Sequence, residues 1–424
     1  PARRTKGDSL DIPALTIFER LLQETGEREI STTQALVQAM TLLCKDKNIG
    51  QRVVPIVPDE ARTFGMEGMF RQIGIYAHEG QKYEPVDRDQ LMYYKENQSG
   101  QLLEEGITED GAMSSWIASA TAYSNSGMQM IPFYIFYSMF GFQRIGDLVW
   151  AAGDMQARGF LIGATSGRTT LNGEGLQHED GHSQIMAGNV PNCVSYDPTF
   201  SHELMVIMQN GMERMFKKQE NVFYYITTMN ENYSHPGLSK GQEKNIVKGM
   251  YLLQKGKKGK TRVQLLGSGS ILREAIAAAD LLSADFKVEA DIWSCTSFNQ
   301  LKRDGDDVSR WNMLHPDKKP KMSHVEKCLL DTDGPVVAAT DYVKLFADQI
   351  RAYVPRSYSV LGTDGFGRSD SRQALRKHFE VDRYYIAVAS LNALMEDGSV
   401  SFKTVNGAIK KYGIDPNKNN PLMS

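Results

Sequence analysis

The sequence has few cysteines, no long apolar segment and little net charge, and each shortage excludes a class of protein. Its four cysteines lie far apart in 424 residues, without the close pairs of a metal site, so we expect reduced, mostly buried thiols. The most apolar segment, Met128–Phe142, is too short to span a membrane. A net charge of −3 creates no field that favours nucleic acid or a membrane surface. These shortages are typical of a soluble globular protein.

The usual signals of targeting and catalysis are also missing. The first residues are charged but no apolar stretch follows them, which excludes a secretory signal and favours a cytoplasmic protein. The sequence contains no GxSxG elbow, no HExxH and no P-loop. The string GSGS at 267–270 lacks the rest of a dinucleotide fingerprint, so we expect a tight turn between a strand and a helix. We expect no residue of this chain to be a metal ligand.

One stretch stands out among what is present. The segment GRTTLNGEGLQHEDGHS, residues 167–183, is dense in glycine, histidine and carboxylates, and it follows the apolar run 159–165, which predicts a buried strand. Glycines let a ligand approach the backbone, and histidine titrates near neutrality. The segment therefore predicts a functional loop, with a solvated loop whose glycines merely turn the chain as the alternative.

Strand and helix patterns alternate throughout the chain. This alternation predicts an α/β protein of two layered domains, each with a mostly parallel sheet, and a length of 424 residues agrees with two domains. We place the first domain at 1–240 and the second at 241–424, because the composition turns polar and then basic from 230 to 259. The lysines of this segment are interpreted as a solvated linker.

Several elements can be placed within these domains. Ser31 precedes an amphipathic pattern and predicts a capped helix. A helix is also expected around Val308–Met313. The polar segment 77–101 has no sustained apolar period, so it predicts a long loop or lid, or else a plain surface excursion. The denser run at 362–372 could face a ligand or a neighbouring subunit.

The remaining chemistry lies in carboxylates and aromatic side chains. A buried carboxylate can share a proton with a ring nitrogen, and an aromatic side chain can stack on a ring, so such a set could bind a heteroaromatic cofactor. Five strings carry this set: DEARTFGMEGMFRQIGIY at 59–76, GITEDGA at 106–112, IPFYIFYSMFGFQRIGDL at 131–148, the loop at 167–183, and LGTDGFGRSDSR at 361–372.

These strings, in this order, closely resemble the homodimeric bacterial pyruvate dehydrogenases, within the transketolase group of thiamin diphosphate enzymes. The likeness covers essentially the whole chain. It implies a pyrimidine-binding middle domain at 1–240 and a transketolase C-terminal-like domain at 241–424. The implied reaction is oxidative decarboxylation of pyruvate in the bacterial cytoplasm. The implied partners are a second copy of the chain and a dihydrolipoamide acetyltransferase, whose lipoyl group accepts the acetyl group.

The resemblance also implies roles for particular residues. Glu109 would hydrogen-bond the aminopyrimidine of thiamin diphosphate, Phe140 would stack on that ring, and Tyr137 would lie beside it. Glu60 and Asp59 would line the polar edge of the same ring. From the residues alone, the two aromatic side chains could equally be core, and Glu60 could cap a helix.

Two further residues and one loop follow from the same resemblance. Ile107 would be the apolar prop that keeps the two rings of the cofactor folded together. His178 would face the reacting carbon as an acid, a base or a hydrogen-bond donor. The segment Glu79–Lys95 resembles a loop that becomes ordered when substrate binds, which we take as a hypothesis.

The match has one gap. Thiamin diphosphate enzymes hold magnesium and diphosphate through a GDG motif and a later asparagine, and this sequence contains no GDG. In the family that motif lies in an N-terminal domain, so this sequence corresponds to the middle and C-terminal domains only and would supply only the pyrimidine end of the cofactor site. We therefore expect the chain to be inactive alone. The alternatives are another transketolase-type enzyme, or a dimerisation or regulatory module without catalysis.

Overall fold

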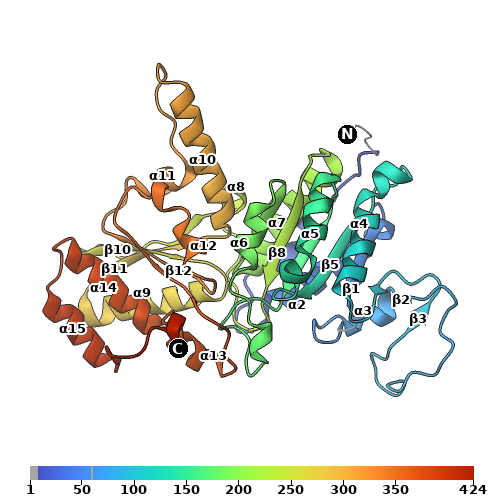
Figure 1. The fold of residues 1–424 in the computed structure, drawn as a ribbon, viewed down its shortest axis with the longest axis horizontal. Helices are drawn as coiled ribbons and strands as arrows, with labels where there is room; N and C mark the ends of the chain where they lie inside the picture. Colours follow the sequence, from blue (N-terminus) through green and yellow to red (C-terminus); the bar gives the residue numbers. More distant parts are fainter. Residues whose placement is uncertain (1–7, 59–60) are drawn as a thin grey trace. The chain divides into compact units, whose positions relative to one another are not determined.

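The chain forms two compact units in a computed structural model that describes residues 8–58 and 61–424 (Figure 1). The first unit contains the described residues up to Ser166, together with Met186–Ser195 and Phe200–Ser239. The second contains Gly167–Ile185, Tyr196–Thr199 and Lys240–Ser424. Two internal segments thus pack with the second unit, whereas a continuous division at residue 240 was expected. The functional assignment of the two domains stays a prediction.

The first unit is built on a six-stranded sheet in the order β4-β1-β5-β6-β8-β7. The pairings β4 with β1, β1 with β5, β5 with β6 and β6 with β8 are all parallel. The central strands are apolar and buried at every position, as expected of parallel strands that are covered on both faces. The strands are β1 (Val53–Val57), β4 (Leu103–Glu104), β5 (Ile131–Tyr137), β6 (Phe160–Ala164), β7 (Cys193–Tyr196) and β8 (Phe223–Thr228).

Helices cover this sheet in two groups. Helices α4 and α5 pack on each other, and α4 packs on β1 and β5, while α2 packs on α7, β1 and β8. The predicted cap of α2 is confirmed, because the Ser31 hydroxyl accepts the backbone N–H of Gln34 at 3.1 Å. The helices are α1 (Glu19–Leu22), α2 (Thr32–Cys44), α3 (Glu67–Gln72), α4 (Glu109–Asn125), α5 (Gly141–Asp154), α6 (Ser183–Asn189), which ends in this unit, and α7 (Ser201–Met212).

The polar segment 77–101 forms the predicted excursion beyond α3. The short strand β2 (Ile75–Tyr76) precedes it and pairs in parallel with β3 (Glu96–Asn97), which lies within it. Within it, Asp87 accepts the backbone N–H of Tyr94 and forms an ion pair with Arg62. Whether substrate changes the order of Glu79–Lys95 stays a hypothesis.

The second unit has a five-stranded sheet in the order β13-β12-β10-β11-β9. Only the edge strand β9 is antiparallel to its neighbour, so the sheet is mostly parallel, and the predicted α/β fold class is confirmed. The strands are β9 (Tyr251–Gln254), β10 (Arg262–Gly267), β11 (Glu289–Ser294), β12 (Val336–Ala339) and β13 (Tyr358–Leu361).

Helices also cover both faces of the second sheet. Helix α9 packs on β10 and β11 and contacts α14, whereas α10, α11 and α12 bury Phe298, Val325 and Phe346 against the other face. No helix within the described residues has the length and apolarity to cross a membrane. The helices are α8 (Glu243–Lys248), α9 (Ile271–Phe286), α10 (Phe298–Leu314), α11 (His324–Leu329), α12 (Leu345–Asp348), α13 (Arg372–His378), α14 (Arg383–Glu396) and α15 (Phe402–Lys411).

Helix α10 begins ten residues earlier than the expected Val308, at Phe298. The first half is rich in aspartate, arginine and lysine, which concealed its periodicity. Phe298, Leu301 and Gly305 are nevertheless buried at helical spacing, and the Ser297 hydroxyl caps the helix by accepting the backbone N–H of Gln300 at 3.0 Å.

The basic segment expected to be a linker lies inside the second unit. The buried carboxylate of Asp291 accepts hydrogen bonds from Lys255 Nζ at 2.8 Å and from the backbone N–H of Gly256 at 2.9 Å, and it pairs with Arg262. Burial alone would raise the pKa of Asp291, but these hydrogen bonds and charges lower it overall. The segment is therefore anchored to β11 by an ionised side chain.

The GSGS string forms the predicted turn between β10 and α9. Gly269 has φ +51°, and a Cβ at this position would lie 2.6 Å from Oδ2 of Asp197. We expect Gly269→Ala to lower the free energy of unfolding by about 1–3 kcal/mol, because the conformation and the close approach both disfavour a side chain. Urea or thermal unfolding of the purified chain measures this change.

Gly407 provides the matched control for this substitution. It is exposed on α15, and no atom of the described residues is within 4 Å of an added Cβ. Gly407→Ala should raise stability by about 0.5–1 kcal/mol, because alanine favours a helix over glycine. Equal stability of Gly269→Ala and the wild type would contradict the account of the turn.

Candidate active site

The carboxyl ends of five strands meet along one edge of the first sheet. The parallel registers place Val57 beside Glu104, and Tyr137 beside Ala164, which in turn lies beside Thr228. In open α/β sheets, ligands bind beyond this edge. The segments that leave it carry most of the site residues expected in the first unit.

Glu109 stands at the start of α4, five residues after β4 ends. The Thr108 hydroxyl caps the helix by accepting the backbone N–H of Gly111 at 3.2 Å. The Tyr134 hydroxyl donates to the backbone carbonyl of Glu109 at 3.3 Å, and burial raises the pKa of Tyr134, so this donor stays protonated. The carboxylate therefore sits at a fixed helix N-terminus, where the helix dipole favours negative charge.

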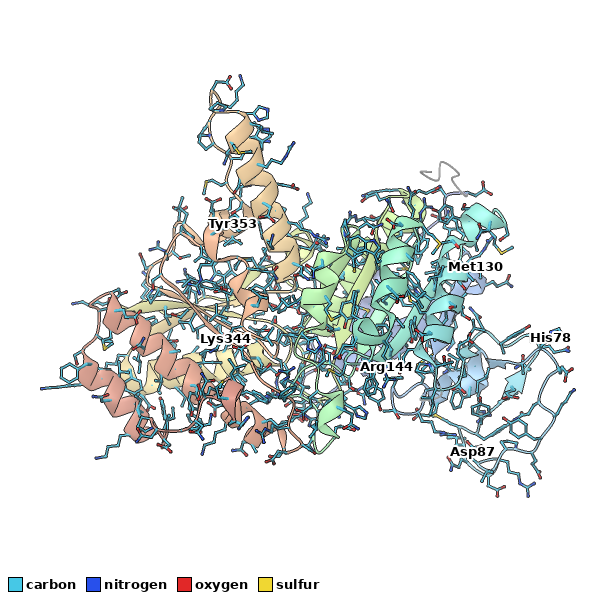
Figure 2. The ribbon with its side chains drawn as sticks, in the orientation of Figure 1. His78, Asp87, Met130, Arg144, Lys344 and Tyr353 are labelled. Carbon is cyan, nitrogen blue, oxygen red and sulfur yellow. The ribbon has the colours of Figure 1, made fainter. Side chains whose placement is uncertain are left out.

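Arg144, labelled in Figure 2, contacts both Glu109 and an aromatic ring. Its Nη1 lies 2.7 Å from Oε1 of Glu109, whose side chain is only 13% exposed. The guanidinium carbon of Arg144 lies 4.1 Å from the centroid of the Phe140 ring. One cation thus contacts both the carboxylate and the ring face. The sequence did not single out Arg144.

The two aromatic residues expected at the site lie side by side. Tyr137 ends β5, and its ring meets that of Phe140 edge to face with centroids 6.0 Å apart. Phe64 supports Tyr137 from another direction, with centroids 5.4 Å apart. Tyr137 is buried, whereas Phe140 is partly exposed just before α5. Phe140 therefore offers ring surface that Tyr137 and Phe64 hold in place.

Ile107 lies two residues before Glu109 and is 75% exposed. The surface between β4 and α5 thus combines an exposed aliphatic side chain, an aromatic ring and a half-buried carboxylate, which are the kinds of contact that a substituted heteroaromatic ring needs. Asp59 and Glu60, expected at the same ring, lie outside the described residues. The structure brings Glu109, Tyr137 and Phe140 together.

His178 belongs to the second unit, in the loop at 167–183. It ends a short 3₁₀ helix, Leu176–His178, and its Nδ1 lies 3.4 Å from Oε2 of Glu174. Its side chain is 21% exposed. A carboxylate beside an imidazole nitrogen orients the ring and selects a tautomer, so His178 is held in a defined position.

The carboxylates after His178 shape the loop. Oδ1 of Asp180 accepts the backbone N–H groups of His182 and Ser183, both at 2.9 Å, at the start of α6. This is the hydrogen bonding of a helix cap. Among residues 8–58 and 61–424, no group of three or more histidine, cysteine, aspartate or glutamate side chains could hold a metal ion.

Contacts join the loop at 167–183 to the loop at 362–372, a pairing that was not predicted from the sequence. The buried guanidinium of Arg168 donates to the carbonyls of Thr363, at 2.8 Å, and of Gly365. The backbone N–H of Arg368 donates to Oε2 of Glu179 at 2.6 Å. We call these contacts the loop latch. The latch fixes the backbone on which His178 is carried.

A buried carboxylate anchors the start of the same loop. Oδ1 of Asp341 accepts the backbone N–H of Thr169 at 2.9 Å and its hydroxyl at 2.7 Å, and Oδ2 accepts the hydroxyl of Thr170 at 2.6 Å. Burial raises the pKa of Asp341 despite these hydrogen bonds. Its position directly after an apolar strand was the one sequence signal that could have identified it.

Glu179 is the strongest titratable feature of the loop latch. It is 1% exposed, and within the described part of the chain no partner lies within hydrogen-bond distance of Oε1. Burial raises the pKa of Glu179 from 4.5 to about 8, although the hydrogen bond from Arg368 opposes the shift. The fold therefore favours the protonated carboxyl. Its contribution to stability is full below pH 4.5 and is lost as the pH rises through about 8.

We expect Glu179→Gln to become more stable, relative to the wild type, as the pH rises from 4.5 to about 8. The amide stays neutral, and its oxygen can still accept the Arg368 N–H. Urea unfolding midpoints over this pH range measure the difference. The stability of Glu179→Ala, relative to the wild type, should rise with pH in the same way. It should be lower than that of Glu179→Gln at every pH, because alanine leaves the Arg368 N–H without its acceptor. Parallel pH profiles for Glu179→Gln and the wild type would exclude this titration.

The arrangement of strands and helices defines the class of protein. The fold is similar to the transketolase of Leishmania mexicana, with a TM-score of 0.65 and 15% identity over 91% of this chain and 48% of that one. It is also similar to a split-gene transketolase, described as an inactive β4 tetramer, with a TM-score of 0.54 and 16% identity over 86% of this chain and 98% of that one. The chain therefore has a transketolase-like fold.

Sequence relationships give the family within this class. The family model "Pyruvate dehydrogenase E1 component middle domain" matches residues 10–236, and "Transketolase-like TK C-terminal domain" matches 249–382. The pyruvate dehydrogenase E1 component of Cupriavidus necator is 62% identical over the whole of this chain. That of Escherichia coli K12 is 58% identical over 98% of it. The chain belongs to the pyruvate dehydrogenase E1 component family. It spans about half the length of these relatives, 48% and 47% respectively.

Proposed function

We propose that this chain supplies the pyrimidine-binding part of the active site of a thiamin diphosphate-dependent pyruvate dehydrogenase. The observation that carries the proposal is the half-buried carboxylate of Glu109 beside the ring of Phe140, in a chain of this family. When bound, thiamin diphosphate supplies a nucleophilic carbon and an electron sink for decarboxylation of a 2-oxo acid. The residues of this chain bind the cofactor, orient it and exchange a proton with it.

Each residue has a distinct role in this proposal. Glu109 hydrogen-bonds the aminopyrimidine and exchanges a proton through its carboxylate oxygen, while Phe140 stacks on the ring. Tyr137 supports Phe140 from behind, and Ile107 presents an aliphatic surface to the cofactor. By resemblance, Asp59 and Glu60 line the polar edge of the ring, and His178 faces the substrate.

Arg144 imposes a condition on cofactor binding. Its guanidinium occupies one face of Phe140 and pairs with Glu109 at the same time. A ring that uses this face and this carboxylate together takes the place of the guanidinium. Before the cofactor binds, the guanidinium of Arg144 holds Glu109 and Phe140 near each other, and the pyrimidine ring then replaces it.

The complete reaction needs more than this chain. The sequence has no GDG motif, and the chain spans about half of each relative, so the ligands of the diphosphate and of magnesium come from the other half. The proposed reaction is oxidative decarboxylation of pyruvate, with acetyl transfer to the lipoyl group of a dihydrolipoamide acetyltransferase. The complete enzyme acts as a homodimer in the bacterial cytoplasm.

This division predicts that the chain alone is inactive. The split-gene transketolase of similar fold, described as inactive, supports this expectation. With thiamin diphosphate and magnesium, the purified chain should release no carbon dioxide from pyruvate. Addition of the amino-terminal half of the Cupriavidus necator relative, as a separate polypeptide, should restore the reaction. Turnover by the chain without that half would contradict the proposal.

The roles of Glu109 and Phe140 can be separated in the reconstituted enzyme. Glu109→Gln should lower turnover at saturating cofactor by about 10²–10⁴-fold, because a positioned acid or base is lost. Phe140→Leu should instead weaken thiamin diphosphate binding by about 2–10-fold with turnover little changed, because stacking is lost. Cofactor titration of the initial rate yields both quantities.

Phe140→Tyr is the matched control, because it keeps the ring and should bind the cofactor like the wild type. Glu109→Ala should be as inactive as Glu109→Gln, since both remove the same proton exchange. Unchanged cofactor affinity in Phe140→Leu would contradict the proposal that Phe140 stacks on the cofactor.

A further inference from the structure

The outer half of helix α10 projects from the second unit (Figure 1). All buried residues of α10 lie at or before Gly305, where the ring of Tyr353 packs so closely that it leaves no room for a Cβ. The Tyr353 hydroxyl donates to Asp306 at the base of the projection (Figure 2). Beyond this point no residue from 306 to 322 is buried, and the helix continues for about 13 Å. The outer half is therefore anchored at one end only.

The end of this projection is nevertheless a folded structure. The Asn312 side-chain amide donates to the carbonyl of Lys321 at 3.0 Å and accepts its backbone N–H at 2.8 Å. The rings of Trp311 and His315 stack with centroids 4.4 Å apart, and Lys321 Nζ lies 3.8 Å from the centroid of the Trp311 ring. These contacts close the turn after α10 and fix its side chains in one arrangement.

We call residues 310–321 the basic tip. It carries four cations, Arg310, Lys318, Lys319 and Lys321, and one carboxylate, so its net charge is +3 in a chain whose net charge is −3. All four cations are exposed. Next to them, Met313 and Leu314 are 71% and 52% exposed. Exposed cations and exposed apolar side chains thus occur together in this short segment.

Complementing the helix dipole would account for some of this charge, because cations stabilise a helix C-terminus. It would not account for the exposed methionine and leucine, nor for the hydrogen bonds and ring contacts that hold the turn. A preorganised surface that combines apolar and charged side chains is typical of protein recognition, where little ordering entropy is lost on binding.

We propose that the basic tip is a docking surface for an acidic segment of a partner protein. The carboxylates of the partner segment pair with Lys318 and Lys319, and its apolar side chains cover Met313 and Leu314. The charge complementarity selects an acidic partner and accelerates the encounter. The small surface makes the contact weak and reversible. A fixed turn with two apolar side chains favours a protein segment over a nucleic acid or a lipid surface.

A labelled peptide that repeats Glu-Glu-Leu tests this proposal with the full 424-residue chain. Fluorescence anisotropy measures its binding, and carbodiimide coupling of carboxylates to amines, followed by mass spectrometry, locates it. The peptide should couple to Lys318 or Lys319, and binding should weaken as salt rises. A Gln-Gln-Leu peptide is the uncharged control.

Two pairs of variants separate the basic tip from general positive charge. Lys318→Glu with Lys319→Glu should weaken binding about tenfold, because two charge pairs become repulsive. Lys257→Glu with Lys258→Glu makes the same charge change in the other exposed basic segment of the second unit and should leave binding unchanged. Unfolding midpoints confirm that both variants are folded.

A third variant tests the folded turn. Asn312→Ala removes the hydrogen bonds to Lys321 without changing any charge, and it should also weaken binding. Equal binding by Asn312→Ala and the wild type would overturn the proposal, since charge alone would then account for it. Equal loss in both lysine pairs would do the same.

Three further outcomes would also overturn it. The first is that the Glu-Glu-Leu peptide does not bind. The second is that the chain self-associates and that Lys318→Glu with Lys319→Glu abolishes this self-association. The third is that the basic tip binds anionic phospholipid vesicles or duplex DNA at least as strongly as it binds the peptide. Self-association would assign the surface to a second copy of the chain, and the last outcome would assign it to a lipid or nucleic acid.

Discussion

Parallel strand pairing is the constraint on which the candidate site depends. In a parallel sheet every strand ends at the same edge. The segments that follow β4 and β5 therefore leave the same edge, with only β1 between them, although they are far apart in sequence. Glu109 and Phe140 become neighbours for this reason. Without that pairing, a carboxylate and an aromatic ring separated by about thirty positions would have no reason to meet.

The second unit depends on buried polar side chains, whereas the first depends on strand geometry. Arg168, Glu179 and Asp341 are each almost fully buried, and each is held by backbone groups or hydroxyls of the two glycine-rich loops. Burial of charge is costly unless hydrogen bonds compensate it, so such groups tolerate few alternative arrangements. Loops that would otherwise be flexible are thereby confined to one conformation around His178.

Local sequence signals identified much of the fold and less of the site. The apolar run of β6 and the cap at Ser31 depend on near neighbours, so the sequence alone predicted them. Glu109, Tyr137 and Phe140 required a family resemblance, because a helix start and two aromatic residues have ordinary structural explanations. Arg144 and the loop latch were missed, since their contacts join segments that only the folded chain brings together. The start of α10 was missed because charged residues dominate its exposed surface.

The division of the chain into units has a consequence for its synthesis. The chain crosses between the units at residues 166, 185, 195, 199 and 239, so neither unit is one continuous stretch of sequence. A ribosome releases Gly167–Ile185 long before it makes the loop at 362–372 that Arg168 and Glu179 contact. During that interval the first unit can already assemble its sheet. The segment that carries His178 therefore cannot form its contacts with the loop at 362–372 until that loop has been translated.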